Sequence, residues 1–224
     1  MTMQPDTPAQ RQAAAFDQIG ARYDEAFPHK QGQLEAGDWL ATQLPAGGRV
    51  LDAGCGTGVP TARRLHEAGH AVTGVDISAG MLDLARQNVP DADFRQLDVL
   101  DLDASLGTFD AVVAFFALLM LLRADVPTAL QRLRDVLSPG GLLALAMVEA
   151  DLDDVPIPFL GNTLRVTGYP RDELCALVTA AGFDVLDLRE YAYEPATPDA
   201  PPEVQLFLYC RRAEAANRSS SMST

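Results

Sequence analysis

The chain has 224 residues, 48% of them hydrophobic and 21% charged, a mixture that is typical of globular proteins and excludes a disordered or fibrous chain. Acidic side chains outnumber basic ones by 31 to 17. The resulting formal charge of −14 repels phosphate backbones, so we expect no nucleic-acid partner. The longest apolar run, residues 111–122, is shorter than the roughly twenty residues that a membrane span needs.

The N-terminus and the cysteines indicate the compartment. Residues 1–12 contain no apolar core of the signal-peptide type. Cys55, Cys175 and Cys210 lie far apart, a spacing that predicts neither a disulfide framework nor a zinc site. We therefore expect a cytoplasmic protein without a metal site or a membrane partner, present as a monomer or a homodimer.

Residues 1–44 are predicted to form a helical segment ahead of the main fold. Apolar side chains such as Phe16 and Ile19 recur at helical spacing between residues 9 and 27. Pro28 ends that pattern, and a second helix is expected over residues 33–44.

From residue 45 onward, apolar runs alternate with helical patterns. Strands that are apolar throughout and alternate with helices are typical of a parallel sheet covered on both faces. The expected strands lie at residues 49–53, 70–75, 93–97, 109–114 and 142–148, and the expected helices at residues 60–68, 78–88 and 125–137. Ser78 is expected to be the N-cap of the second of these helices.

The end of the chain departs from this alternation. A helix over residues 170–181 precedes two strands, 183–191 and 204–210, with no helix between them. Such strands form a hairpin, so we predict a doubly wound α/β fold: a mostly parallel, seven-stranded sheet with a C-terminal antiparallel hairpin and an N-terminal helical lid. One domain is expected over residues 1–212, with its core at 45–212 and a disordered tail at 213–224.

A glycine-rich turn follows the first strand of the expected sheet. Asp52 ends that strand, and Gly54, Cys55, Gly56 and Gly58 follow before a helix begins. Glycines here let a ligand approach the backbone closely. In open α/β sheets, ligands bind beyond the carboxyl ends of the strands.

Acidic residues end the next two strands as well. Asp76 can accept both hydroxyls of a ribose, although it can equally act as a helix cap, and Asp98 can accept from an adenine amine. Val59 occupies the third glycine position of a dinucleotide loop. Asp52 disfavours a pyrophosphate and suits a cation. Together these residues predict a site for a nucleoside that carries a positive charge.

At this point the chain resembles the class I S-adenosylmethionine-dependent methyltransferases of the small-molecule type, from about residue 15 to 212. The resemblance is carried by VLDAGCGTG (50–58), VTGVDIS (72–78) with Met81, LDV (97–99), FDAVVAFFALLML (109–121), LSPGGLLAL (137–145) and AGF (181–183). It implies S-adenosylmethionine as the cofactor and a small molecule as the methyl acceptor.

The resemblance also implies where the cofactor binds. The backbone of residues 54–58 would lie against its methionine part, and Asp76 would hold the ribose. The remaining contacts implied are Ile77 and Met81 at the adenine, Asp98 and Val99 at its amine, Ala114 and Phe115 closing the site, and Tyr23 reaching in from the lid.

The base that would act on the acceptor is less clear. Many relatives carry a histidine pair after the fourth strand, where this chain has Leu119 and Met120. The candidates are therefore His29 in the lid and Glu149 at the end of the fifth strand, which heads an irregular segment, residues 149–168, expected to be a substrate loop. An oxygen or nitrogen acceptor is expected.

Three alternatives stay open. The first is a NAD-dependent oxidoreductase, which Val59 and Asp52 disfavour. The second is an enzyme that uses S-adenosylmethionine for a reaction other than methylation. The third is a module that binds the cofactor without turnover.

Overall fold

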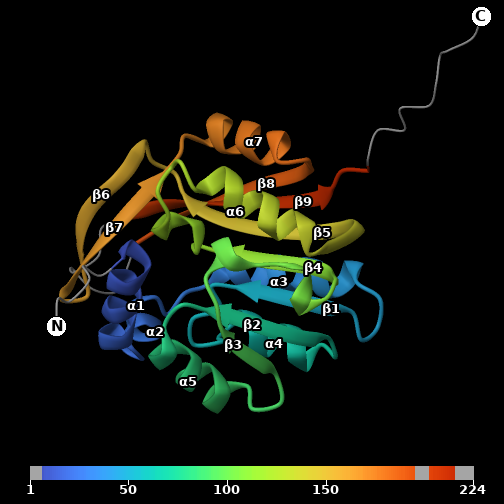
Figure 1. Ribbon diagram of the computed structural model, residues 1–224, viewed down its shortest axis with the longest axis horizontal. Coiled ribbons are helices and arrows are strands. Elements are labelled where there is room, and N and C mark those ends of the chain that lie inside the picture. The colour runs from blue at the N-terminus through green and yellow to red at the C-terminus, as the bar shows by residue number, and fades with distance from the viewer. Residues whose placement is uncertain (1–6, 195–201, 215–224) are drawn as a thin grey trace, which may run out of the picture.

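Helices cover both faces of a central sheet in the computed structural model, which describes residues 7–194 and 202–214 (Figure 1). The strands lie in the order β3 (Asp93–Gln96), β2 (Ala71–Asp76), β1 (Arg49–Ala53), β4 (Phe109–Phe115), β5 (Leu137–Val148), β9 (Glu203–Arg212) and β8 (Phe183–Tyr193). The pairs from β3 to β5 are parallel, and β9 is antiparallel to both of its neighbours. This is the predicted doubly wound sheet with its closing hairpin.

Two apolar layers hold the helices to the sheet. On one face α3 (Gln31–Gln43), α4 (Thr61–Glu67) and α5 (Ala79–Asn88) bury side chains against β1, β2 and β4. On the other face α6 (Val126–Asp135) and α7 (Arg171–Ala180) pack with the short helices η1 (Val99–Asp101) and η3 (Leu118–Met120). A third short helix, η2 (Ala104–Leu106), precedes β4. No helix within the described ranges is long and apolar enough to cross a bilayer.

Residues 8–26 form two helices where the sequence pattern predicts one. α1 (Pro8–Ile19) begins at a capping box formed by Thr7 and Gln10. It ends at Gly20, whose φ of 53° breaks the helix before α2 (Arg22–Ala26). Apolar side chains recur at helical spacing on both sides of Gly20, because both helices bury an apolar face. The spacing therefore gives no sign that the first helix ends at this glycine.

The expected loop after β5 is an antiparallel hairpin, β6 (Leu152–Phe159) and β7 (Asn162–Gly168). Two prolines in β6, Pro156 and Pro158, argue against a strand in sequence alone. They are tolerated because β6 belongs to a two-stranded sheet and leaves one side unpaired. The turn residues Leu160 and Gly161 both have positive φ, 47° and 78°, as a two-residue hairpin turn requires.

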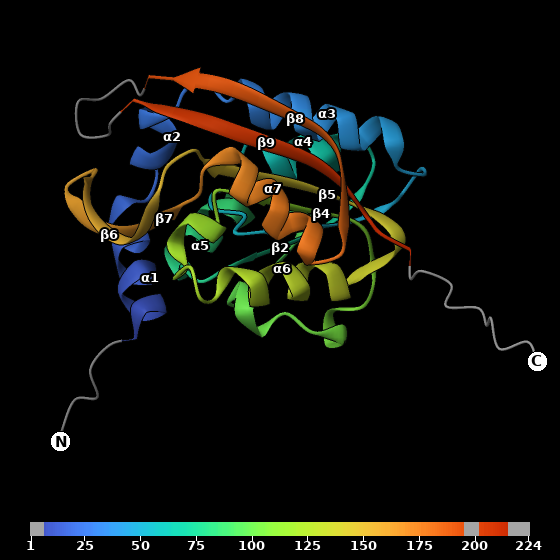
Figure 2. The same ribbon diagram turned by 90° about the horizontal axis from the view of Figure 1, so that it is seen from above.

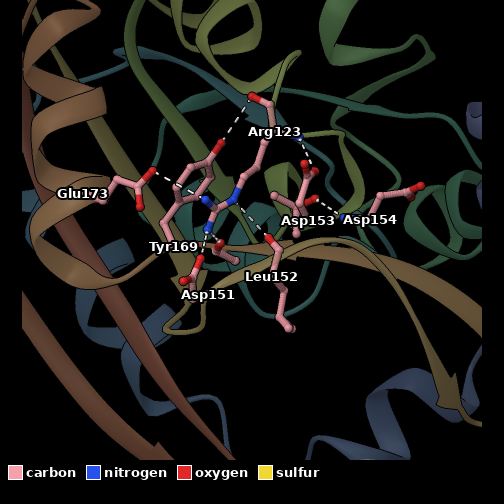
Figure 3. Close-up of polar contacts among 9 residues, drawn as sticks. Arg123, Asp151, Leu152, Asp153, Asp154, Tyr169 and Glu173 are labelled. Atoms are coloured by element: carbon pink, nitrogen blue, oxygen red, sulfur yellow. Dashed lines mark hydrogen bonds and ion pairs between the residues drawn. The ribbon is translucent and has the colours of Figure 1, made fainter.

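Arg123, in the segment between η3 and α6, fastens the base of this hairpin (Figure 3). Its guanidinium donates to the carbonyls of Leu152 and Gly168, at 3.2 and 2.8 Å, and to the Asp151 carboxylate at 2.6 Å. It also lies over the ring of Tyr169, 4.6 Å from the centroid, and the Tyr169 hydroxyl donates back to the Arg123 carbonyl at 3.3 Å.

We expect Arg123→Ala to lower the free energy of unfolding by about 2–4 kcal/mol, because two backbone carbonyls and a carboxylate lose a charged donor at once. Urea denaturation measures the change. Arg95→Ala is the control: the ion pair of Arg95 with Asp93 is half exposed on both sides, and such pairs contribute at most about 1 kcal/mol. Equal losses in the two variants would contradict the anchoring role.

Candidate functional site

The glycine-rich turn after β1 is fastened to the end of β2. The backbone N–H groups of Gly54 and Cys55 both donate to the Val75 carbonyl, at 2.8 and 3.0 Å. Gly54 has a φ of 76°, and a Cβ at this position would lie 2.5 Å from the Cβ of Ala117. Only glycine therefore fits, and the turn lies where β1 and β4 send their following helices to opposite faces, which is the usual ligand crevice of such sheets.

Asp76 bridges this turn and the helix that follows β2. One carboxylate oxygen accepts from the Gly56 N–H and the other from the Ser78 N–H, each at 2.9 Å. Burial raises its pKa. The helix cap itself is Ser78, whose hydroxyl accepts from the Met81 N–H at 3.0 Å, as the sequence predicts. Asp76 thus orders the turn and still has lone pairs available for a ligand.

Asp52 is a buried carboxylate with an unused oxygen. Its side chain is 3% exposed, and Oδ2 has no hydrogen-bond partner among the described residues. Burial, and then the nearby charge of Asp76, raise its pKa to about 7. A buried charge is costly unless it is paired, so this position suits a ligand that brings a positive group.

Most of the predicted cofactor residues line one cavity, which has a volume of about 1310 Å³. A ligand pocket usually has a volume of about 300–1,000 Å³, so this cavity has room for two small molecules. The predicted cofactor residues that line the cavity are Tyr23, Asp52, Gly54, Cys55, Gly56, Asp76, Ile77, Met81, Asp98, Val99 and Phe115.

Two of the predicted residues lie behind the cavity wall. Ala114 is fully buried in the core between the sheet and α6, because alternate residues of β4 face opposite sides. A Cβ on Gly58 would lie 3.3 Å from the Cβ of Ala85 in α5. Gly58 therefore permits close packing of a helix, and neither residue lines the cavity.

The sequence patterns missed Phe116, which follows β4 directly. It lines the cavity and has a φ of 60°, an uncommon conformation for an aromatic residue. Its N–H donates to the Ala146 carbonyl at 2.9 Å, and its ring meets that of Phe207 edge-on at 5.8 Å. Strain of this kind clusters at functional sites, but a sequence carries no signal for it.

The opposite wall of the cavity is apolar and comes from distant segments. Both views place α1, α2 and the β6–β7 hairpin at the same end of the sheet (Figures 1 and 2). Gln12 of α1 donates to the Arg165 carbonyl of β7 at 2.8 Å. Apolar side chains fill the space around it: Phe16, Leu119, Met120, Leu152, Ile157, Phe159, Leu164 and Val166.

Five aromatic side chains join these walls. We call Phe16, Tyr23, Phe27, Phe159 and Tyr193 the aromatic cluster. Phe27 stacks on Tyr23 at 5.2 Å, on Tyr193 at 5.5 Å and on Phe159 at 5.8 Å. Tyr23 is buried, which raises its pKa, so its hydroxyl stays protonated. The cluster joins the lid helices to the hairpin and to the end of β8.

A second link ties the lid to the glycine-rich turn. Asp24 accepts a hydrogen bond from the Thr57 hydroxyl at 2.7 Å and forms an ion pair with Lys30. Lys30 also donates to the Val59 carbonyl at 3.2 Å. The helices before the sheet are therefore fixed to the loop that the sequence identifies as a cofactor site.

Both predicted bases, Glu149 and His29, line the cavity, but their surroundings differ. Glu149 accepts two hydrogen bonds from the Arg171 guanidinium, each at 2.9 Å, and this pairing lowers its pKa. His29 is exposed at the cavity. The partner of Glu149 is Arg171, the first residue of α7. The local sequence around Glu149 does not show that this helix begins beside it.

Comparisons with known proteins agree with this geometry. Residues 50–141 match a family model described as a methyltransferase domain. The methyltransferase GfsG of Streptomyces halstedii is 31% identical over 77% of this chain and 68% of its own. The malonyl-[acyl-carrier protein] O-methyltransferase of Erwinia pyrifoliae is 32% identical over 84% of this chain and 70% of its own.

A solved structure shows the same fold at lower identity. The Burkholderia thailandensis 1,6-didemethyltoxoflavin-N1-methyltransferase, with 1,6-didemethyltoxoflavin and S-adenosylhomocysteine bound, is 23% identical. It superposes with a TM-score of 0.69 over 96% of this chain and 94% of its own.

We expect Asp52→Asn to raise the free energy of unfolding of the ligand-free protein at pH 8 by about 2–4 kcal/mol, since each pKa unit corresponds to about 1.4 kcal/mol. Because burial raises the pKa of Asp52 to about 7, folding favours the protonated form. The stability contributed by Asp52 is complete below its ordinary pKa of 3.8 and is lost as the pH rises through about 7.

The gain should therefore shrink toward zero at pH 4, as measured by urea denaturation across that range. Asp91→Asn, at an exposed carboxylate, should change stability little at either pH. A gain that does not depend on pH would contradict the assignment.

Proposed function

The chain belongs to the class I S-adenosylmethionine-dependent methyltransferases that act on small molecules, and from that premise we propose that it methylates an oxygen or nitrogen atom of a largely apolar metabolite. The observation that supports this proposal is the shape of this cavity. It joins the glycine-rich turn and the acids at the ends of β1 and β2 to an apolar wall built by α1, η3 and the hairpin.

S-adenosylmethionine supplies an electrophilic methyl group on a sulfonium centre. The unpaired oxygen of Asp52 fits the ammonium group of this cofactor, and the open space beside the Gly56 backbone leaves room for its methionine part. We assign Asp76 to the ribose hydroxyls, and Ile77 and Met81 to one face of the adenine. Asp98, Val99 and Phe115 line the remainder of that half of the cavity.

The main task of the protein in such a transfer is to hold the acceptor in line with the reacting methyl group and to exclude water. The lid helices and the hairpin perform the second task, because the aromatic cluster and the Gln12–Arg165 contact hold them together over the cavity. The apolar wall between them orients an acceptor by its shape.

A base is required when the acceptor is protonated at working pH. Glu149 is held rigidly at the end of β5, but its pairing with Arg171 lowers its pKa and makes it a weak base. His29 is exposed and lies in the lid. We therefore propose that alignment contributes most of the rate and that these two side chains are the candidates for any proton transfer.

The test is to incubate the protein with S-adenosylmethionine labelled in its methyl group and a metabolite extract of the organism that encodes it. We expect one class of apolar product to acquire the label. Conversion of a metabolite without transfer of label would overturn the proposal in favour of a non-methylating reaction, and cofactor binding without conversion of any metabolite would favour a binding module.

With the acceptor in hand, Glu149→Gln and His29→Ala separate the two candidate bases. A side chain that acts as the base should cost about 10²–10⁴-fold in turnover when replaced, while the affinity for S-adenosylhomocysteine holds. Losses of no more than a few-fold in both variants would mean that alignment alone suffices.

We expect Asp76→Ala to weaken the binding of S-adenosylhomocysteine at least about tenfold, because hydrogen bonds to a charged group contribute about 1.5–3 kcal/mol each. Calorimetry measures the dissociation constant, and circular dichroism checks that the variant is folded. An unchanged constant in a folded variant would mean that Asp76 serves only to order the turn. The wild-type protein should show no comparable binding of NAD.

A further inference from the structure

The open end of the β8–β9 hairpin brings a carboxylate into the acceptor half of the cavity. Glu203 is the direct cross-strand partner of Tyr193, so the two side chains stand on the same face of the sheet, with Cβ atoms about 4.5–5.5 Å apart. Gln205, two residues on, lies on that face too and donates to the Glu203 carboxylate at 2.6 Å. All three line the cavity.

Glu203 differs from Glu149 and Asp154, which also line the cavity, in having no arginine paired with it among the described residues. Glu149 is paired with Arg171 and Asp154 with Arg165. Among the described residues, Glu203 has the Gln205 amide as its partner, and burial raises its pKa. The connecting residues 195–201 contain no lysine, arginine or histidine, so that segment supplies no cation.

Aromatic rings stand around this carboxylate. Tyr193 carries its ring into the aromatic cluster through the stack on Phe27, and Glu203 lies near enough to Tyr23 and Tyr193 for its charge to raise the pKa of both phenols. The Tyr193 hydroxyl is buried without a hydrogen-bond partner among the described residues. Ring faces, a carboxylate and an unused hydroxyl all attract a cationic donor.

We propose that Glu203, Tyr193 and the neighbouring rings bind a protonated amino group of the methyl acceptor, which makes the acceptor an apolar amine. This inference rests on the proposed function and names the substrate class of the same cavity. An ammonium group has three donors, which match the Glu203 carboxylate and the Tyr193 hydroxyl. The apolar body then extends toward the wall formed by Phe159, Leu164 and their neighbours.

The cofactor carries an ammonium of its own, so the test is made with that site already filled. Wild-type protein is saturated with S-adenosylhomocysteine, and two probes of matched shape, 3-phenylpropylamine and 3-phenylpropan-1-ol, are titrated at pH 7.5 by calorimetry. We expect the amine to bind at least about tenfold more tightly than the alcohol, because a charge-assisted hydrogen bond contributes about 1.5–3 kcal/mol.

Glu203→Gln should remove that preference, leaving the affinity for the alcohol and for S-adenosylhomocysteine unchanged. The matched control is Glu190→Gln on the same hairpin, because Glu190 is exposed, pairs with Arg171 and lies outside the cavity. It removes the same formal charge and should retain the preference for the amine.

Equal binding of amine and alcohol to the wild type, binding of neither probe, or an amine preference that survives Glu203→Gln would overturn the proposal. None of these outcomes touches the proposed function, which depends on binding of S-adenosylhomocysteine and on transfer of label. Failure of S-adenosylhomocysteine to bind would be the sign that the proposed function itself is wrong.

Discussion

The hydrogen bonds between the end of β2 and the turn after β1 are the constraint on which the site depends. Val75 accepts from two consecutive N–H groups of the turn, and Asp76 accepts from a third. These contacts fix the backbone of the turn at the point where the strand order of the sheet reverses. They also bring the carboxylates of Asp52 and Asp76 close enough for one to raise the pKa of the other.

The carboxylates that line the cavity differ in whether an arginine is paired with them. Glu149 and Asp154 have arginine partners that lower the pKa of each, and these ion pairs hold α7 and the hairpin in place. Asp52 is buried and Asp76 and Glu203 are partly buried. None of the three has an arginine partner among the described residues, and desolvation raises the pKa of each. Carboxylates kept in this state are stabilised by ligands that carry positive charge, which suits a cationic cofactor.

The acceptor half depends on segments that lie far apart in the chain. α1 reaches the hairpin through Gln12 and Arg165, 153 residues later. Arg123 in turn anchors that hairpin, through the carbonyls of its first and last residues. Both contacts join segments that lie outside the seven-stranded sheet, so these walls can change without a change in the strands that carry the glycine-rich turn. In this way a fold can keep one half of a site and vary the other.

The sequence by itself determined the sheet, the glycine-rich turn and most of the cofactor half. Those features rest on local patterns: apolar runs, glycines at a strand end, and acids after successive strands. Ser78 as the cap of α5 is of the same kind, because a cap acts on a residue three positions away. Neither Gly58 nor Ala114 lines the cavity, so their predicted contact with the cofactor stays a prediction.

Only the tertiary structure decided the rest. Which way Ala114 and Phe115 face depends on how β4 is packed between two helix layers. The β6–β7 pairing depends on long-range register, which the prolines of β6 conceal. The pairing of Glu149 with Arg171 depends on where α7 packs beside the sheet. The lack of such a partner for Glu203 among the described residues depends on the place of β9 within the sheet. Charge state and orientation are properties of neighbours in space, and a linear pattern does not contain those neighbours.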